Sequence, residues 1–173
     1  MAYIIQPLQK WHDRSDFDCG NHFLNEYLQH FARQNHHKGI ARAFVMVPED
    51  TENPVVGYYT LSAGSLSFKQ IPQKIQKALP KYPVPIARIG ELAVSKNLQG
   101  QGIGAALLLS AFNRIVHASE AMAVWAVVVD PIDQQALTFY QKFGFELLID
   151  SETLFLTMKD LLAWTTSDLL SAP

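Results

Sequence analysis

The stretch that decides the fold is Gln99-Gly100-Gln101-Gly102-Ile103-Gly104. It follows an apolar segment that predicts a strand over Ile86–Val94, and it begins the most apolar helix pattern of the chain, Gly102–Ser119. Glycines at the start of a helix let a ligand approach the backbone closely and leave N–H groups unpaired. Together with the helix dipole, these N–H groups favour phosphate or pyrophosphate. A turn that only packs the helix against the sheet is the structural alternative.

Two other phosphate-binding motifs do not fit this loop. The dinucleotide fingerprint requires Gly-x-Gly-x-x-Gly, whereas the loop reads Gly-x-Gly-x-Gly. The phosphate loop of nucleotide hydrolases requires Lys followed by Ser or Thr, and Ala105 and Ala106 follow the glycines here. The loop therefore indicates an anion site of another kind.

Apolar periodicity and turn residues on both sides of the loop predict the remaining elements. The predicted helices are Asn21–Gln34, capped by Asn21 and ended by Gly39, then Ile71–Leu79, Asp133–Phe143 and Asp160–Leu170. The predicted strands are Ala41–Val47 and Val55–Phe68, which form a hairpin across a polar turn, then Val124–Val129, Phe145–Ile149 and Thr153–Met158. This order predicts an α/β fold, a mixed sheet with helices against it, in a single domain over residues 1–173.

Composition excludes several classes of protein. Hydrophobic residues make up 49% of the chain and charged residues 17%, which argues against intrinsic disorder. The single cysteine, Cys19, allows neither an internal disulfide nor a multi-cysteine metal site, and a reducing, cytoplasmic compartment is expected. No signal peptide is visible, and the apolar runs fall short of the roughly 20 residues of a membrane helix. The six histidines lack metal-ligand spacing, so we predict no metal.

Charge is unevenly distributed along the sequence although its net value is only −2. The segment 53–90 contains no acidic residue, whereas in the segment 117–173 eight acidic residues stand against two lysines. A segregated basic region attracts phosphate groups. The alternative is that folding mixes the two segments on one surface, and charge alone does not decide between them.

Three motifs in order resemble the GNAT N-acetyltransferase superfamily. Gln99-x-x-Gly102-x-Gly104 is similar to its acyl-CoA loop, and Leu92-Ala93-Val94 looks like the strand before that loop. Ala136-Leu137-Thr138-Phe139-Tyr140, followed by Gly144-Phe145, resembles the closing signature of the superfamily. The resemblance implies the GNAT acyl-CoA N-acyltransferase fold, with acetyl-CoA as co-substrate.

The resemblance extends to the TacT/AtaT-like group of GNAT toxins from type II toxin–antitoxin modules. It rests on Phe17-Asp18-Cys19-Gly20-Asn21, Leu24-Asn25-Glu26-Tyr27-Leu28, Ala32-Arg33-Gln34-Asn35-His36, Val56-Gly57-Tyr58-Tyr59-Thr60-Leu61-Ser62 and Tyr82-Pro83-Val84-Pro85. The resemblance implies acetylation of the α-amine of an aminoacyl-tRNA, which blocks translation. It also implies silencing by a ribbon-helix-helix antitoxin, contact with DNA only through the antitoxin complex, and no membrane partner. A homodimer is left open.

The family motifs assign acyl-CoA contacts to particular positions. Leu92, Ala93 and Val94 would hold the pantetheine arm, and Gln99, Gly100, Gln101, Gly102, Ile103, Gly104 and Ala105 would hold the pyrophosphate. Asp133 stands where the family often has an Asn that contacts CoA. As an alternative, Asp133 caps the helix predicted over Asp133–Phe143.

Tyr140 is the predicted catalytic residue, because in the toxin group the tyrosine at this motif position is catalytic. The pKa of a phenol is ~10 and that of a thiol is ~8.5, so a tyrosine O–H can donate a proton to a developing thiolate. Without the motif, packing beside Phe139 would be the simpler role for Tyr140. Cys19 is expected to be a packed residue and not a nucleophile.

Glu91 departs from the toxin pattern, which often has Arg just before Leu-Ala-Val. It could be a general base, could pair with Arg88 or a lysine, or could lie at the sheet surface. The pKa of an α-amine is ~7.7–8.0, whereas that of a lysine side chain is ~10.4. Deprotonation of the amine of an aminoacyl-tRNA therefore needs only a weak base or water.

The expected phosphate contacts to tRNA are Arg33, Lys38, Arg42, Lys77 and Arg88, although any one of them could be an ordinary solvated charge. Two other functions remain open. A GNAT enzyme that acetylates a small-molecule or protein amine would not be a toxin, and a protein that only binds CoA, antitoxin or DNA would not turn over. The sequence identifies neither the isoacceptor nor the antitoxin.

Overall fold

The structure is a computed structural model that describes residues 1–164. The chain divides into two compact units. Unit 1 consists of Met1–Ser62 and Gly90–Ala111, and unit 2 consists of Ala63–Ile89 and the chain from Phe112 onward. The glycine loop belongs to unit 1 and Tyr140 to unit 2.

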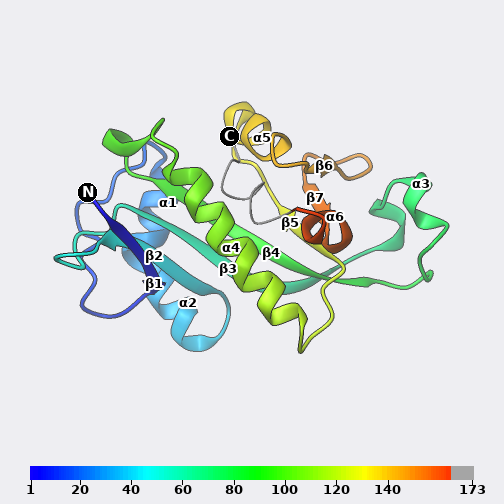
Figure 1. The fold of residues 1–173 in the computed structure, drawn as a ribbon, viewed down its shortest axis with the longest axis horizontal. Helices are drawn as coiled ribbons and strands as arrows, with labels where there is room; N and C mark the ends of the chain where they lie inside the picture. Colours follow the sequence, from blue (N-terminus) through cyan, green and yellow to red (C-terminus); the bar gives the residue numbers. More distant parts are fainter. Residues whose placement is uncertain (165–173) are drawn as a thin grey trace. The chain divides into compact units, whose positions relative to one another are not determined.

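The strands form a mixed sheet in the order β1-β2-β3-β4-β5-β7-β6, in which β4 and β5 are parallel and the pairs β1–β2, β2–β3, β5–β7 and β6–β7 are antiparallel. The strands are β1 (Tyr3–Pro7), β2 (Arg42–Pro48), β3 (Gly57–Leu66), β4 (Val84–Val94), β5 (Ala126–Val129), β6 (Glu146–Leu147) and β7 (Leu154–Thr157). The helices are α1 (His22–Glu26), α2 (Ala32–Lys38), α3 (Gln73–Gln76), α4 (Ile103–Ser119), α5 (Gln134–Gln141) and α6 (Met158–Leu162). The predicted α/β class with a mixed sheet is confirmed (Figure 1).

The first helical segment of unit 1 runs without a break from His22 to Lys38 and contains α1, a π turn η1 (Tyr27–Phe31) and α2. The Asn21 carboxamide oxygen accepts a hydrogen bond from the Leu24 N–H at 3.0 Å, as expected of an N-cap. Gly39 ends the segment in the left-handed region, with φ of 73°. The predicted helix is confirmed and continues past Gln34 to Lys38.

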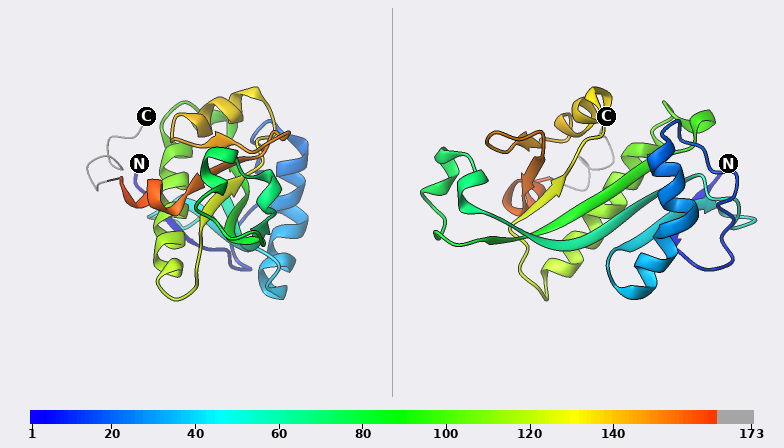
Figure 2. Two further views of the ribbon diagram at one scale, coloured as in Figure 1. Left: turned by 90° about the vertical axis from the view of Figure 1, so that its right-hand side faces the viewer. Right: turned by 180° about the vertical axis from the view of Figure 1, so that it is seen from behind.

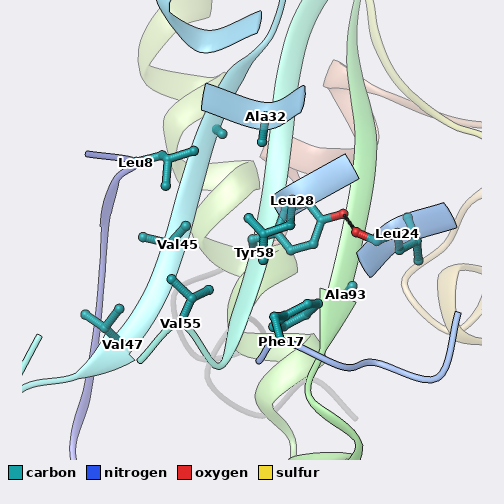
Figure 3. Packing of buried hydrophobic residues seen from close by; sticks show 11 residues of the cluster. Leu8, Phe17, Leu24, Leu28, Ala32, Val45, Val47, Val55, Tyr58 and Ala93 are labelled. Carbon is teal, nitrogen blue, oxygen red and sulfur yellow. Dashed lines mark hydrogen bonds between the residues drawn. The ribbon is translucent and has the colours of Figure 1, made fainter. Parts of the chain in front are cut away.

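The core of unit 1 lies between this helical segment and the strands (Figure 3). Leu24, Leu28 and Ala32 of the helical segment pack against side chains of the strands, among them Val45 and Tyr58. The buried Tyr58 hydroxyl donates to the Leu24 carbonyl at 2.7 Å, so this polar atom enters the core with a partner.

The first half of α4 covers the opposite face of the strands of unit 1 (Figures 1 and 2). Tyr59, next to Tyr58 on β3, points to that face, and its hydroxyl lies 2.8 Å from the Ser110 hydroxyl of α4. Gly57 allows the close approach, because a Cβ there would lie 3.0 Å from Leu107 Cδ1. The helix that follows the glycine loop is thereby fixed to the sheet.

Unit 2 is built on the parallel β4–β5 pair and the antiparallel β5–β7 pair. Its core cluster consists of Leu66, Ile71, Val84, Ile86, Ala126, Val128, Leu148 and Phe155. The Trp125 ring stacks on Phe155 with 6.0 Å between ring centroids. Apolar side chains from the strands and from the segment after β3 therefore close this core.

Several predicted elements differ from the structure, among them the strand predicted over Phe145–Ile149, of which only Glu146–Leu147 forms. The strand β1 was not predicted, and α3 is shorter than the predicted Ile71–Leu79 because Pro72 precedes it and Pro80 follows. The helix α4, whose apolar pattern would suit a helix buried all round, exposes Ala106, Asn113 and His117. The last helix starts at Met158 and ends at Leu162. The helix predicted over Asp160–Leu170 therefore starts two residues earlier than predicted and does not include residues 163–164. Residues 165–170 of that prediction lie outside the described part of the chain.

Candidate functional site

The glycine loop leaves room for a ligand in front of its backbone. Gly100 and Gly102 have φ of 75° and 82°, a conformation that L side chains rarely adopt, and a Cβ at either position would meet nothing within 4 Å. The helix α4 begins directly afterwards at Ile103, and the first N–H groups of a helix have no partner within the helix. Gln99, Gly100, Gln101, Gly102, Ile103, Gly104 and Ala105 thus form one continuous segment of the kind that binds a pyrophosphate.

The loop is held by the segment Asp18–Cys19. The Gln99 side-chain amide nitrogen donates to the carbonyls of Cys19 and Val94, both at 2.9 Å. The Lys96 backbone N–H donates to the Asp18 carbonyl at 2.9 Å, and the Lys96 ammonium lies 2.8 Å from the Asp18 carboxylate. Gln99 therefore shapes the loop through its side chain, and sequence reasoning, which assigned it only to ligand binding, missed this role.

Asp18 is a shared acceptor in this arrangement. Besides Lys96, its carboxylate accepts from the Gly20 N–H and the Asn25 side chain, each at 2.9 Å. The hydrogen bond from Lys96, followed by those from Gly20 and Asn25, lowers the pKa of Asp18 to about 2. The motif at residues 17–21 was found by resemblance, and the structure shows that it connects the first helical segment to the glycine loop.

Strand β4 continues beyond its parallel partner. β5 ends at Val129, which pairs with Ile89, whereas β4 runs five residues further, through Val94. Leu92, Ala93 and Val94 lie in this extension, with Ala93 and Val94 buried. The backbone of the extension therefore has no β5 residue beside it, as binding of an extended pantetheine chain requires.

Glu91 lies in the same extension and bonds to Thr60 of β3. The Thr60 hydroxyl donates to the Glu91 carboxylate and accepts from the Glu91 N–H at 3.1 Å. The neighbouring Gly90 is required for this arrangement, because a Cβ there would lie 2.7 Å from the Thr60 hydroxyl oxygen. Burial raises the pKa of Glu91 although the bond from Thr60 lowers it. Of the roles considered for Glu91, pairing with Arg88 is not observed, since Arg88 pairs with Asp130.

Tyr140 lies on α5 of unit 2 and is buried. Its ring contacts Phe139 and Phe145 edge to face, with centroids 5.2 and 5.5 Å away. Burial raises the pKa of Tyr140, so the phenol keeps its proton through the physiological range. The closing signature at residues 136–145 therefore builds an aromatic cluster around a protonated hydroxyl.

Asp133 is the N-cap of α5, and its carboxylate accepts from the Ala136 N–H at 2.8 Å. The capping alternative for Asp133 is confirmed. Cys19 is half-buried against the core of unit 1, and burial raises the pKa of its thiol, so the thiolate is not favoured.

The five cationic candidates for tRNA contact differ in their surroundings. Arg33 and Lys38 are exposed on α2, and Arg42 on β2 donates to the His36 carbonyl at 2.7 Å. Lys77 is exposed at the end of α3. Arg88 forms an ion pair with Asp130, which also accepts from the Thr153 hydroxyl at 2.6 Å.

Folding mixes part of the segregated charge in unit 2. The Arg88–Asp130 pair joins the acid-free segment to the acidic C-terminal segment, and Lys74 lies 3.6 Å from Glu146. The alternative that folding mixes the two segments is therefore supported for unit 2, whereas Arg33, Lys38 and Arg42 belong to unit 1.

Neither a metal site nor a membrane helix is found in residues 1–164. These residues contain no group of three or more His, Cys, Asp or Glu side chains that could hold a metal ion. None of their helices has the length and apolar character needed to cross a bilayer.

Comparison with known families decides the identity of this fold. The model of the acetyltransferase (GNAT) family matches residues 5–145. The chain belongs to the GNAT acetyltransferase family. This GNAT chain is 35% identical, over 86% of its length and 87% of the relative, to a tRNA-acetylating toxin of Mycobacterium tuberculosis. It also resembles a structure of a KacT mutant with one tyrosine changed to phenylalanine, with a TM-score of 0.89, 29% identity and coverage of 94% of this chain and 98% of KacT.

Solved complexes of related toxins are similar to this GNAT chain as well. AtaT complexed with acetyl-methionyl-tRNAfMet has a TM-score of 0.87 and 32% identity, covering 93% of this chain and 98% of AtaT. A tyrosine-to-phenylalanine mutant of AtaT, bound to the C-terminus of the antitoxin AtaR and to acetyl-CoA, has a TM-score of 0.79 and 28% identity over 99% of each chain. The KacTA–DNA complex has a TM-score of 0.78 and 29% identity, covering 93% of this chain and 96% of the other.

Proposed function

We propose that this protein is an acetyl-CoA-dependent N-acetyltransferase toxin that acetylates the α-amine of aminoacyl-tRNA and thereby blocks translation. The observation that carries the proposal is the similarity, over most of the chain, to a tRNA-acetylating toxin and to AtaT in complex with acetyl-methionyl-tRNAfMet. The open glycine loop and the β4 extension, which we assign to acyl-CoA, support the proposal. The chain is proposed to act as one domain over residues 1–173.

The acyl-CoA site is assigned residue by residue. Leu92, Ala93 and Val94 would bind the pantetheine arm through their backbone, and Gln99 to Ala105 would bind the pyrophosphate through N–H groups of the loop and α4. Asp133 is a weaker member of the set, because its carboxylate already caps α5. When bound, acetyl-CoA supplies the acetyl thioester.

Tyr140 is proposed as the general acid. In the transfer, the bond from the amine nitrogen to the acetyl carbon forms and the carbon–sulfur bond breaks. The amine loses a proton to water or a weak base, and the Tyr140 O–H donates one to the departing thiolate. Burial raises the pKa of Tyr140, so the phenol is protonated when the thiolate develops, and the phenolate left by the transfer regains a proton from water.

The partners follow from the related complexes. Because AtaT is solved with its antitoxin AtaR and KacTA is solved with DNA, an antitoxin of the ribbon-helix-helix class is proposed to bind this chain and to connect it to DNA. The proposed compartment is the cytoplasm, where charged tRNA and acetyl-CoA are both present. A homodimer is consistent with this proposal but not required by it.

Transfer of labelled acetyl from acetyl-CoA to a pool of charged tRNAs tests the function. The wild type is expected to give labelled N-acetyl-aminoacyl-tRNA, and Tyr140→Phe is expected to lose about 10²-fold or more of the rate, because its ring packing is kept and its proton is lost. Tyr82→Phe, which alters an exposed tyrosine of unit 2, is the matched control and should keep wild-type activity.

The same assay separates the other two functions. Label on a small amine or a protein, with none on any charged tRNA, would identify an ordinary GNAT acetyltransferase. Acetyl-CoA binding without transfer to any amine, in wild type and Tyr140→Phe alike, would identify a binding protein.

A further inference from the structure

One face of the first helical segment carries two exposed aromatic side chains with a half-buried one between them. Phe23, Tyr27 and Phe31 follow one another at intervals of four residues, so they share one side of the helix. Phe23 is 63% exposed and Phe31 is 49% exposed, whereas the other phenylalanines of the chain are buried or half-buried. The π turn, closed by the Ala32 N–H donating to the Tyr27 carbonyl, lies between the last two, and such turns are frequent at functional sites.

This aromatic face adjoins the acyl-CoA side of unit 1 through Tyr27. The Tyr27 ring stacks on Tyr58 with centroids 6.4 Å apart, and its hydroxyl accepts from the Asn35 side chain at 3.3 Å. Tyr27 packs against the core cluster that contains both Tyr58 and Ala93, the middle residue of the Leu92–Val94 extension. Tyr27, the middle residue of the aromatic face, therefore lies against the core beside the strand extension that is assigned to the pantetheine arm.

The other end of the same segment is cationic. The last turn of α2 contains His36, His37 and Lys38, and Arg42 follows at the start of β2, where it bonds to the His36 carbonyl. Between His22 and Lys38 the only acidic residue is Glu26. A partner that lies along this segment thus meets cations first and exposed aromatic rings next.

This combination distinguishes between classes of partner. A duplex nucleic acid is bound through its phosphates and shape and leaves aromatic rings unused, whereas unpaired nucleotides stack on aromatic side chains while lysine or arginine holds their phosphates. A purely apolar partner would gain nothing from Lys38 and Arg42.

We propose that the face formed by Phe23, Tyr27 and Phe31 binds the single-stranded 3′ end of the aminoacyl-tRNA. Unpaired bases would stack on Phe23 and Phe31, Lys38 and Arg42 would hold the phosphates, and the aminoacyl ester would reach past Tyr27 toward the Leu92–Val94 extension. The inference rests on the proposed function for the identity of the RNA, and it assigns the surface that positions this substrate.

The test compares two forms of one uncharged tRNA, full-length and lacking its unpaired 3′ nucleotides, by fluorescence anisotropy. The wild type is expected to bind the full-length form at least about tenfold more tightly. The double variant Phe23→Ser/Phe31→Ser is expected to lose this difference while it binds the truncated form and acetyl-CoA as the wild type does. The matched control, Tyr82→Ser/Met122→Ser, removes side chains that are 66% and 68% exposed in unit 2 and should keep the difference.

Three outcomes would overturn the proposal. The first is a wild type that binds both forms equally, and the second is a double variant that keeps the tenfold difference. The third is a double variant that changes its sedimentation coefficient, which would identify the face as a contact between copies. Because uncharged tRNA is the probe, a wild type that discriminates the two forms but transfers no acetyl refutes the proposed function and leaves this inference standing.

Discussion

The Thr60 hydroxyl is placed so that it meets both the backbone and the side chain of Glu91. It accepts from the Glu91 N–H and donates to the carboxylate, and the missing Cβ of Gly90 leaves the space that this requires. The carboxylate is thereby kept at a half-buried position, where its charged form is disfavoured. The sequence identified Glu91 as a departure from the family pattern, but the bond to Thr60 joins residues 31 positions apart and has no local signal.

We expect Glu91→Gln to stabilise the protein at pH 8. Burial raises the pKa of Glu91 above its ordinary value of 4.5, so between these two values the folded state holds more protons than the unfolded state. Stability contributed by this group is therefore present at low pH and lost as the pH rises through that window. Glutamine cannot ionise, and its side-chain oxygen can still accept from Thr60.

Urea midpoints at pH 4 and pH 8 measure this effect. The midpoint of Glu91→Gln should exceed that of the wild type at pH 8, and the excess should shrink or vanish at pH 4. Glu49→Gln, at an exposed position in the turn after β2, serves as the control and should not alter the midpoint at either pH. An excess of the same size at both pH values would contradict the explanation.

At the scale of elements, the sequence predicts best where the apolar period is strong and the ends are marked. Asn21 and Gly39 mark the first helical segment, and the glycines mark the start of α4. β1 escaped prediction because it is a five-residue strand at the sheet edge whose residues are all half-buried or exposed. The glycine loop was found from its own residues, whereas its attachment to Cys19 joins residues 80 apart in the sequence.

The glycine loop should be sensitive to alanine because of its backbone and not because of crowding. Gly100→Ala and Gly102→Ala would force an L side chain into positive φ, which costs about 1 kcal/mol or more per residue. We expect the loop to relax to another conformation and the KM for acetyl-CoA to rise about tenfold, with a smaller change in kcat.

Gly39→Ala is the control for this prediction. Gly39 also has a positive φ, of 73°, and open space around its Cα, but it ends α2 and is remote in sequence from the loop. Its substitution should lower the melting temperature by a similar amount and leave the KM for acetyl-CoA unchanged. Equal effects of all three substitutions on KM would refute a specific role of the loop.

At the scale of the whole molecule, the chain that we predict to be a single domain consists of two compact units. Three elements pass from one unit into the other: β3, β4 and α4 each have residues in both. Elements shared in this way cannot unfold in one unit without losing hydrogen bonds at the boundary, so we expect the two units to unfold together.

Tryptophan fluorescence can test this expectation. Trp11 belongs to unit 1, and Trp125 and Trp164 belong to unit 2. Trp125→Phe/Trp164→Phe leaves a reporter in unit 1, and Trp11→Phe/Trp164→Phe leaves one in unit 2. In each variant the fluorescence transition in urea should coincide with the loss of far-ultraviolet circular dichroism, and separated transitions would show that the units are independent domains.

The two hydrogen bonds from the Gln99 side chain to backbone carbonyls also affect the catalytic cycle. They fix the loop by contacts that belong to the protein alone, one to Val94 and one to Cys19. The entropy cost of ordering these residues is therefore met once, when the chain folds, and does not recur in every catalytic cycle. An enzyme that must replace spent CoA after each acetylation gains from such a preformed cradle, because each new cofactor molecule meets a loop that is already in its binding shape.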